Sequence, residues 1–263
     1  DDIKGLNASQ KFTGQITAVL ILIPFGFMVK QLTLPFLGTV PLHWVFGLIL
    51  TPIWLIGLTN AMNLIDGMDG LAGGVALIAS LILSIISFLN GNSSQGVLLP
   101  ISIVMFALAG STLGFLWHNF HPAKIFMGDC GAMFIGFLLG AALIQIFYHN
   151  PVSGNAFAPI FILGLPIIDT TWAIARRRWN RKYLFSGDKG HIHHRLLNLG
   201  LAQRKAALVL YAVCLSLGAL GFIITRISNP IAVVALIFLT ALSIIVSLVL
   251  LARKSPFRQN ETE

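Results

Sequence analysis

Acidic residues are scarce in this sequence, and glutamate is almost absent. Asp and Glu together make up nine of the 263 residues, and both glutamates lie within the last three positions. The other carboxylates are Asp1, Asp2, Asp66, Asp69, Asp129, Asp169 and Asp188. The chain is 56% hydrophobic with a mean hydropathy of +0.87, and a carboxylate near a membrane interior is costly and usually functional. The aspartates are therefore the first candidates for a functional site.

Cysteine and internal repeats are also lacking. Cys130 and Cys214 lie far apart in apolar surroundings, and neither belongs to a CxxC pattern. This excludes a disulfide framework and a cysteine-based zinc site. We detect no internal repeat, so the inverted halves found in many transporters are missing as well.

Long apolar runs, by contrast, are abundant. A membrane-spanning helix needs roughly 20 mostly apolar residues, whereas helices of a soluble protein show amphipathic stripes. Eight runs qualify: Ile16–Leu34, Pro41–Thr59, Leu71–Leu89, Val97–Leu116, Ala132–Tyr148, Ala156–Ala175, Ala206–Thr225 and Pro230–Ala252. The sequence predicts an all-α, polytopic integral membrane helix bundle of about eight spans.

The basic residues predict the orientation of these spans. With a cytoplasmic N-terminus, all but two of the 17 Lys and Arg residues fall on the inner side, the exceptions being Lys30 and Arg226. This is the positive-inside pattern. The net charge of +8 is thus a topology signal, with attraction to anionic membrane lipids as a second effect, and it does not indicate nucleic-acid binding.

The same topology places the polar segments on one side of the membrane. We expect one transmembrane catalytic domain over residues 1–252 and a polar cytoplasmic tail over residues 253–263. The expected cytoplasmic loops are residues 1–15, 60–70, 117–131 and 176–205. Asp169 lies close to the inner end of its expected span, where a structural hydrogen bond is favoured over a chemical role. Since the chain opens on Asp1 without an initiating Met, we expect it to be the remainder of a longer protein.

The segment 60–74, NAMNLIDGMDGLAGG, is the most specific motif. Its four glycines and two aspartates lead directly into an apolar run. Exposed N–H groups at a helix N-terminus beside a Gly-rich turn bind phosphate oxygens. Asp66 and Asp69 are three residues apart and so lie on one helical face, where they would hold a metal ion bridging those oxygens. A tight turn capped by Asp is the plainer alternative.

Two further segments repeat this chemistry. In residues 119–131, NFHPAKIFMGDCG, Asp129 lies between glycines at a helix start, where it acts as an N-cap or as a metal ligand. In residues 186–196, SGDKGHIHHRL, three histidines stand beside Arg195. Imidazole and guanidinium groups donate hydrogen bonds to phosphate, so we expect an anion site rather than zinc. Mg2+ favours carboxylates together with substrate phosphate oxygens, so the three motifs predict a magnesium-dependent reaction at phosphate.

At these motifs the chain resembles the polyprenyl-phosphate N-acetylhexosamine-1-phosphate transferases, which include the enzymes that start teichoic acid and O-antigen synthesis. The resemblance implies transfer of N-acetylhexosamine-1-phosphate, GlcNAc-1-phosphate above all, from a UDP-sugar to undecaprenyl phosphate with release of UMP. It implies a site on the cytoplasmic face of the bacterial plasma membrane and Mg2+ as cofactor, with Mn2+ as an alternative. A homodimer is left open.

The resemblance also implies roles for individual residues. The catalytic residues would be Asp1, Asp2, Lys11, Asp66 and Asp69. The metal ligands would be Asp66 and Asp129. The substrate-binding residues would be Asn60, Asn63, Asn119, Phe126, His191, His193, His194 and Arg195. Which Asp is the base stays open, and direct attack by the lipid phosphate is favoured over an enzyme intermediate.

Three rival functions stay open at this point. The phospho-N-acetylmuramoyl-pentapeptide transferase of peptidoglycan synthesis is a relative, although the HIHHRL segment favours the GlcNAc-1-phosphate branch. An intramembrane prenyltransferase would need two paired Asp motifs, and only Asp66 and Asp69 form such a pair. A transporter would need polar residues through the depth of the bilayer, and here the centres of the runs are apolar.

Overall fold

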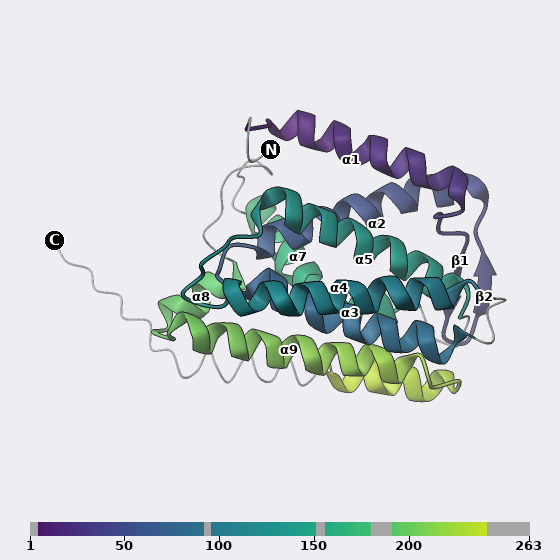
Figure 1. The fold of residues 1–263 in the computed structure, drawn as a ribbon. Coiled ribbons are helices and arrows are strands. Elements are labelled where there is room, and N and C mark those ends of the chain that lie inside the picture. The colour runs from purple at the N-terminus through teal and green to yellow at the C-terminus, as the bar shows by residue number, and fades with distance from the viewer. Residues whose placement is uncertain (1–4, 92–95, 151–155, 180–190, 241–263) are drawn as a thin grey trace.

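The computed structural model describes residues 5–91, 96–150, 156–179 and 191–240. Within these ranges the chain is a helical bundle with one small β-hairpin (Figure 1). Five of the described helices are long and apolar enough to cross a membrane. They are α2 (Trp44–Ile65), α3 (Leu71–Leu89), α4 (Leu98–Asn119), α5 (Gly128–Tyr148) and α9 (Gln203–Ile224). The predicted class, an all-α polytopic membrane bundle, is confirmed, while the division into one catalytic domain and a tail stays a prediction.

The first expected span is shorter than predicted. Helix α1 (Ala8–Leu22) begins at a capping box, in which the side chains of Asn7 and Gln10 each accept a hydrogen bond from the other residue's backbone N–H. It continues as a single 3-10 turn, η1 (Ile23–Phe25), and Gly26 ends it at a φ of 88°, a conformation that glycine adopts without a Cβ penalty. The chain then forms strands β1 (Gln31–Leu34) and β2 (Gly38–Pro41), paired antiparallel. The helix predicted as far as Leu34 is therefore wrong beyond Phe25.

The sixth expected span is divided into two helices. Helix α6 (Ala158–Ile162) ends at Leu163, and α7 (Gly164–Trp179) follows at once. Pro166 in the first turn of α7 has no N–H to continue the hydrogen bonds of α6. Of the eighth expected span, the structure describes a helix over Pro230–Thr240, and the rest lies outside the described residues.

Helix α3 forms the centre of the bundle. Two thirds of the most apolar 18-residue stretch of α3 is buried inside the protein, whereas one third of the corresponding stretch of α4, at the edge of the bundle, is buried. Small residues allow the helices around it to approach closely, as is common in membrane bundles. A Cβ at Gly136 on α5 would lie 2.7 Å from the Leu58 carbonyl oxygen on α2.

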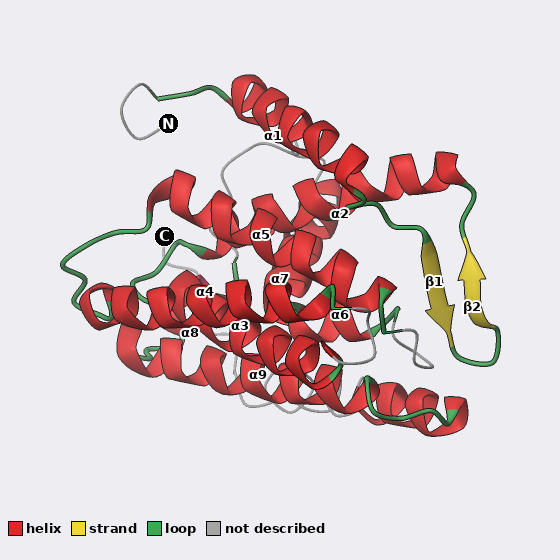
Figure 2. Ribbon diagram, turned by 45° about the vertical axis from the view of Figure 1, so that its right-hand side comes forward, coloured by secondary structure: helices red, strands yellow, loops and turns green. Residues whose placement is uncertain are grey.

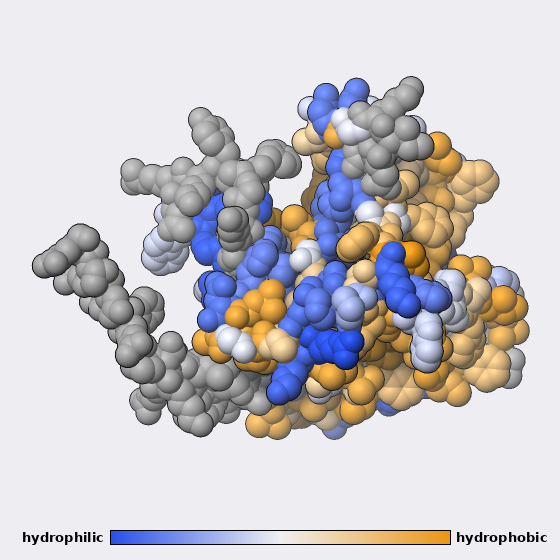
Figure 3. All heavy atoms as spheres, turned by 60° about the vertical axis from the view of Figure 1, so that its left-hand side comes forward, coloured by the Kyte–Doolittle hydropathy of each residue, from blue (hydrophilic) through white to orange (hydrophobic). Residues whose placement is uncertain are grey.

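The two ends of the bundle differ in character. The start of α1, the α2–α3 turn, the α4–α5 loop and α8 (Ile192–Asn198) lie at one end, and the β-hairpin lies at the other (Figures 1 and 2). Hydrophilic side chains gather at the first end, and apolar ones cover the flank of the bundle (Figure 3). The described parts of the motif-bearing loops are thus brought together at one end, as the topology predicts.

Candidate active site

Asp129 lies where α1, α2 and α5 meet. It occupies the first turn of α5, and its carboxylate receives one donor from each of the other two helices. The Lys11 ammonium on α1 forms an ion pair with Oδ2, and Asn63 Nδ2 on α2 donates to Oδ1 at 2.9 Å. Three residues predicted for the site from separate segments therefore form one cluster.

Asp66 lies beside this cluster under different conditions. It caps the C-terminus of α2 and is half-buried, and no described residue donates a hydrogen bond to its carboxylate. Burial raises the pKa of Asp66 to about 7, and the negative charge of Asp129 adds to the rise. The two carboxylates are therefore close enough to repel each other. The negative charge of Asp66 is not offset by a hydrogen bond from any described residue.

A divalent cation fits this pair. Among the described residues no group of three or more His, Cys, Asp or Glu side chains is arranged to hold a metal ion. Mg2+, however, is commonly bound through only one or two carboxylates, with substrate phosphates and waters completing its shell. Asp66 and Asp129 match that donor set, and their unfavourable proximity is what a cation would relieve.

Asp69 and Asn119 are engaged by the protein itself. Asp69 Oδ2 lies 2.8 Å from His121 Nδ1 and accepts a hydrogen bond from the Ala123 N–H at 3.1 Å. Buried Asn119 accepts from the Gly70 N–H at 3.0 Å and donates to the Ile125 carbonyl at 2.8 Å. Both residues thus join the α2–α3 turn to the α4–α5 loop, which shapes the site.

Asn60 and Phe126 lie in opposite environments. Asn60 exchanges two hydrogen bonds with the Gln15 side chain, at 2.9 and 3.3 Å, and so ties α1 to α2. Phe126 is 75% exposed on the α4–α5 loop, where its ring is free to stack on a ligand. The remaining predicted site residues before α1, Asp1 and Asp2, lie outside the described residues.

The HIHHRL segment forms α8, which is anchored to α7 through Asp169. His191 Nδ1 lies 2.8 Å from Asp169 Oδ2, and the Ile192 N–H donates to Oδ1 at 2.9 Å. Both side chains are buried. The structural hydrogen bond expected for Asp169 is confirmed, and it fixes the direction in which the following histidines point.

His193 is buried without a hydrogen-bond partner. Neither ring nitrogen has one among the described residues, and a Cβ at Gly67 would lie 2.8 Å from Nε2. The ring therefore packs directly on the turn that carries Asp66 and Asp69. Burial lowers the pKa of His193 to about 4, with His194 adding to the effect, so the ring is neutral near pH 7. Arg195 is exposed, with its guanidinium 5.9 Å from the centroid of the Trp172 ring.

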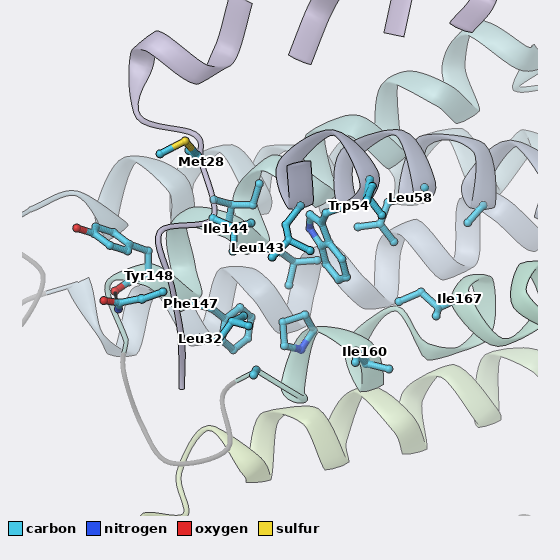
Figure 4. Close-up of a pocket in the computed structure, with 18 of the residues that line it drawn as sticks. Met28, Leu32, Trp54, Leu58, Leu143, Ile144, Phe147, Tyr148, Ile160 and Ile167 are labelled. Atoms are coloured by element: carbon cyan, nitrogen blue, oxygen red, sulfur yellow. Dashed lines mark hydrogen bonds between the residues drawn. The ribbon is translucent and has the colours of Figure 1, made fainter. Parts of the chain in front are cut away.

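An apolar cavity of about 530 Å³ runs along the bundle towards this site. It is lined by α2, α5, α6, α7 and the segment around β1, and Figure 4 shows Trp54, Leu143 and Ile167 in its wall. Its lining also includes Ala61 and Thr170. In the sequence, Ala61 lies two residues before Asn63, and Thr170 directly follows Asp169. The cavity therefore approaches the level of the carboxylates.

Comparisons with known proteins identify the family of this chain. The model of glycosyl transferase family 4 matches residues 1–147, more than half of the chain. This chain belongs to glycosyl transferase family 4. The family model covers the cluster of Lys11, Asn63, Asp66 and Asp129, and α8 and α9 lie beyond the matched segment.

Individual relatives refine the comparison. A probable undecaprenyl-phosphate N-acetylglucosaminyl 1-phosphate transferase of Bacillus subtilis is 41% identical over 81% of this chain and 58% of its own length. A decaprenyl-phosphate N-acetylglucosaminephosphotransferase of Mycolicibacterium smegmatis is 40% identical over 80% and 56%. A phospho-N-acetylmuramoyl-pentapeptide-transferase of Lactobacillus johnsonii is 34% identical over 84% and 65%. The chain thus spans less than two thirds of the length of these relatives.

Several residues that contact the candidate site of this family 4 member were not predicted from the sequence. His121 binds Asp69, and Arg204 and Tyr211 on α9 reach the two loops. His121 stands inside a motif, so its proximity to Asp129 was a usable signal. Tyr211 is one polar residue in a long apolar run, and nothing in the sequence pattern distinguishes it.

Proposed function

We propose that the protein transfers N-acetylhexosamine-1-phosphate, with GlcNAc-1-phosphate as the preferred group, from a UDP-sugar to undecaprenyl phosphate. A phosphate oxygen of the lipid attacks the β-phosphorus of the UDP-sugar, the bond from that phosphorus to the bridging oxygen breaks, and UMP leaves. The observation that carries the proposal is the pairing of Asp66 with Asp129 at the polar end of a membrane bundle. The names of the relatives support the same reaction.

Asp66 and Asp129 would hold Mg2+, with Mn2+ as an alternative. When bound, the ion neutralises the charge of the diphosphate oxygens, which is the main requirement of phosphoryl transfer. Asn63 keeps the Asp129 carboxylate in one orientation through its hydrogen bond. Lys11, whose ammonium group pairs with Asp129, would supply a second positive charge for the same phosphates.

The remaining site residues would bind the two substrates. Neutral His193 presents a ring N–H to a ligand without a charge penalty, and His194 and Arg195 follow it on α8. The exposed Phe126 ring would stack on the uracil, since aromatic rings bind nucleobases by stacking. Asp1 or Asp2 would assist deprotonation of the lipid phosphate, in keeping with the resemblance.

The apolar cavity would take part of the polyprenyl chain. Its volume lies within the range of about 300–1,000 Å³ typical of ligand pockets, enough for a portion of a long lipid. A phosphate at Asp129 with its chain in the cavity has the polar group at the water-facing end and the hydrocarbon inside the bundle. We propose that this end faces the cytoplasm in a bacterial plasma membrane.

The decisive measurement is UMP release by purified full-length protein given UDP-GlcNAc, undecaprenyl phosphate and Mg2+. We expect release that requires the lipid and stops on addition of EDTA, and Asp129→Asn should abolish it while the protein still inserts and folds. Turnover only with UDP-N-acetylmuramoyl-pentapeptide would assign the peptidoglycan reaction instead. No UMP from any UDP-sugar would refute the proposal.

A further inference from the structure

Helix α9 contacts both loops that form the site, through two side chains. Tyr211 Oη donates a hydrogen bond to the Gly70 carbonyl at 2.5 Å, and Arg204 Nε donates to the His121 carbonyl at 2.7 Å. Gly70 ends the α2–α3 turn, and His121 lies in the α4–α5 loop. A single helix therefore fastens the backbone of the turn that carries Asp66 and that of the loop that leads to Asp129.

Gly70 is the point where these restraints converge. Its φ is 78°, and both of its backbone polar groups are held by side chains from other helices. Asn119 on α4 accepts from its N–H, and Tyr211 on α9 donates to its carbonyl, which also accepts from the Gly74 N–H at the start of α3. Side chains from two other helices therefore add to the backbone hydrogen bonds that hold the turn.

The Tyr211 ring is wedged in place by packing. A Cβ at Gly74 would lie 2.2 Å from Cε1 and Cζ of Tyr211, so the ring occupies the space beside the first turn of α3. The Phe120 ring also lies near it, at a centroid distance of 6.5 Å and an angle of 43°. The hydroxyl is thus presented to Gly70 by a ring with little room to move.

Helices α8 and α9 contact the same turn at two points. His193 packs on Gly67 and Tyr211 bonds to Gly70, three residues apart. Arg204 adds a contact to the loop, whose His121 side chain is in turn bonded to Asp69. All three contacts come from residues beyond the segment that the family model matches.

We propose that Tyr211 and Arg204 are positioning residues, which set the separation of the α2–α3 turn from the α4–α5 loop and thereby the geometry of the metal and nucleotide sites. Tyr211 acts on the turn that carries Asp66, and Arg204 acts on the loop that carries His121 and Phe126. The assignment of metal and nucleotide to these two parts rests on the proposed function.

The experiment uses Tyr211→Phe, which removes only the hydroxyl group. Residues that orient metal ligands from outside their shell alter metal affinity or activity by about 10- to 100-fold. We expect the Mg2+ concentration for half-maximal UMP release to rise about tenfold, with a thermal midpoint close to that of the wild type. Ser216→Ala is the matched control, because among the described residues this exposed hydroxyl of α9 bonds to nothing but the Ala212 carbonyl of its own helix. The control should leave the Mg2+ requirement unchanged.

A second variant separates the two contacts. Arg204→Gln should raise the KM for UDP-GlcNAc about fivefold, because the geometry of the α4–α5 loop changes. The Mg2+ requirement should stay near the wild-type value. Arg204→Lys, which keeps a donor at this position, should recover part of the loss. A wild-type Mg2+ requirement in Tyr211→Phe, or losses that simply follow the thermal midpoint, would overturn the proposal.

A binding readout keeps this test separate from the test of the reaction. The rise in thermal midpoint on titration with Mg2+ reports metal binding without turnover. If the wild type binds Mg2+ but releases no UMP, the proposed reaction fails, and a weaker Mg2+ response of Tyr211→Phe still supports the positioning role. If the wild type shows no response to Mg2+ and no turnover, both proposals fail.

Discussion

Asp66 and Asp69 stand three residues apart in one motif, yet their surroundings are opposite. Asp69 accepts a backbone hydrogen bond and pairs with His121. The carboxylate of Asp66 receives no hydrogen bond from the described residues, and burial raises its pKa. The Asp69 carboxylate is thus bonded within the fold. The Asp66 carboxylate is left without a described hydrogen bond, in an unfavourable state that a ligand would relieve.

The histidines of α8 repeat this contrast. His191 is paired with Asp169 and holds the helix in place. His193 is buried against the turn, with no hydrogen-bond partner among the described residues. An unpaired buried polar group costs free energy, and a ligand bound beside Gly67 would remove this cost by supplying a partner. In each motif, one of the repeated residues is bonded within the fold and the other is left without a described hydrogen bond.

Substitution of the two carboxylates tests this division with the largest expected effect. Asp66→Asn should lower Mg2+-dependent UMP release by more than about 100-fold and leave folding intact, since no described hydrogen bond depends on this carboxylate. Asp69→Asn should cost roughly tenfold in rate and about 1–2 kcal/mol in the free energy of unfolding, because it weakens bonds to a charged group. Parallel UMP assays and denaturation curves measure both. Equal effects on rate and stability would remove the distinction.

The histidine pair should show a smaller effect of the same kind. We expect His193→Ala to lower the transfer rate about tenfold and to destabilise the protein less than His191→Ala does, since His193 makes no hydrogen bond within the described fold and only the packing of its ring is lost. His191→Ala should lower the free energy of unfolding by about 2 kcal/mol, because it leaves Asp169 buried and unpaired. Thermal unfolding in detergent and the UMP assay separate the two. A loss of stability in His193→Ala as large as that in His191→Ala, with an unchanged rate, would show that its role is structural.

The pH dependence of stability sharpens the comparison further. The pKa of Asp66 rises from its ordinary value of 3.8 to about 7 in the fold, so the folded protein keeps a proton that the unfolded chain loses. Its contribution to stability is complete below about pH 4 and is lost as the pH rises to about 7. The pKa of His193 falls from 6.5 to about 4, so its contribution has the opposite sign: it is present above pH 6.5 and lost as the pH falls to about 4.

Thermal midpoints in EDTA over this pH range measure both contributions. The difference between the wild type and Asp66→Asn should shift against the wild type as the pH rises. The difference between the wild type and His193→Ala should shift in its favour over the same interval. Two differences that change in the same direction would contradict the assignment of the shifts to these groups.

Asn60 should give the smallest effect. Its side chain bonds to Gln15 across α1 and α2, and such bonds in membrane bundles are worth about 0.6 kcal/mol on average. Asn60→Ala should therefore change the rate less than about threefold, with a small fall in thermal midpoint. A loss of tenfold or more at unchanged stability would return Asn60 to the substrate-binding residues predicted from the sequence.

Much of the bundle follows from the sequence, because the length of an apolar run suffices to identify a membrane helix. The runs that became α2, α3, α4, α5 and α9 were predicted on that basis, and the alternation of spans placed the motifs at one end. Helix ends were less well predicted. The polar residues Asn60 and Asn63 read as loop but continue α2 to Ile65, since their side chains find partners on α1 and α5.

Other parts depend on contacts that no local pattern contains. The end of α1 rests on the combination of Pro24 and Gly26, which an average over an apolar window conceals. The different fates of Asp66 and Asp69 depend on His121 and Ala123, more than 50 positions away. The contribution of Tyr211 depends on which helix packs beside Gly70. The residue types were enough to predict which segments form the candidate site. The contacts that distinguish Asp66 from Asp69 could be seen only in the structure.

The close contacts of Gly67 in the α2–α3 turn and of Gly74 in the first turn of α3 have a consequence for how this sequence can change. The space that a side chain at Gly67 or Gly74 would fill is taken by the rings of His193 and Tyr211. A Cβ at either position is therefore compatible with the fold only when the opposing ring is replaced by something smaller. Mutational drift in the most specific motif of the chain is coupled to positions more than 120 residues downstream, so the turn and the α8–α9 region can vary only as a pair.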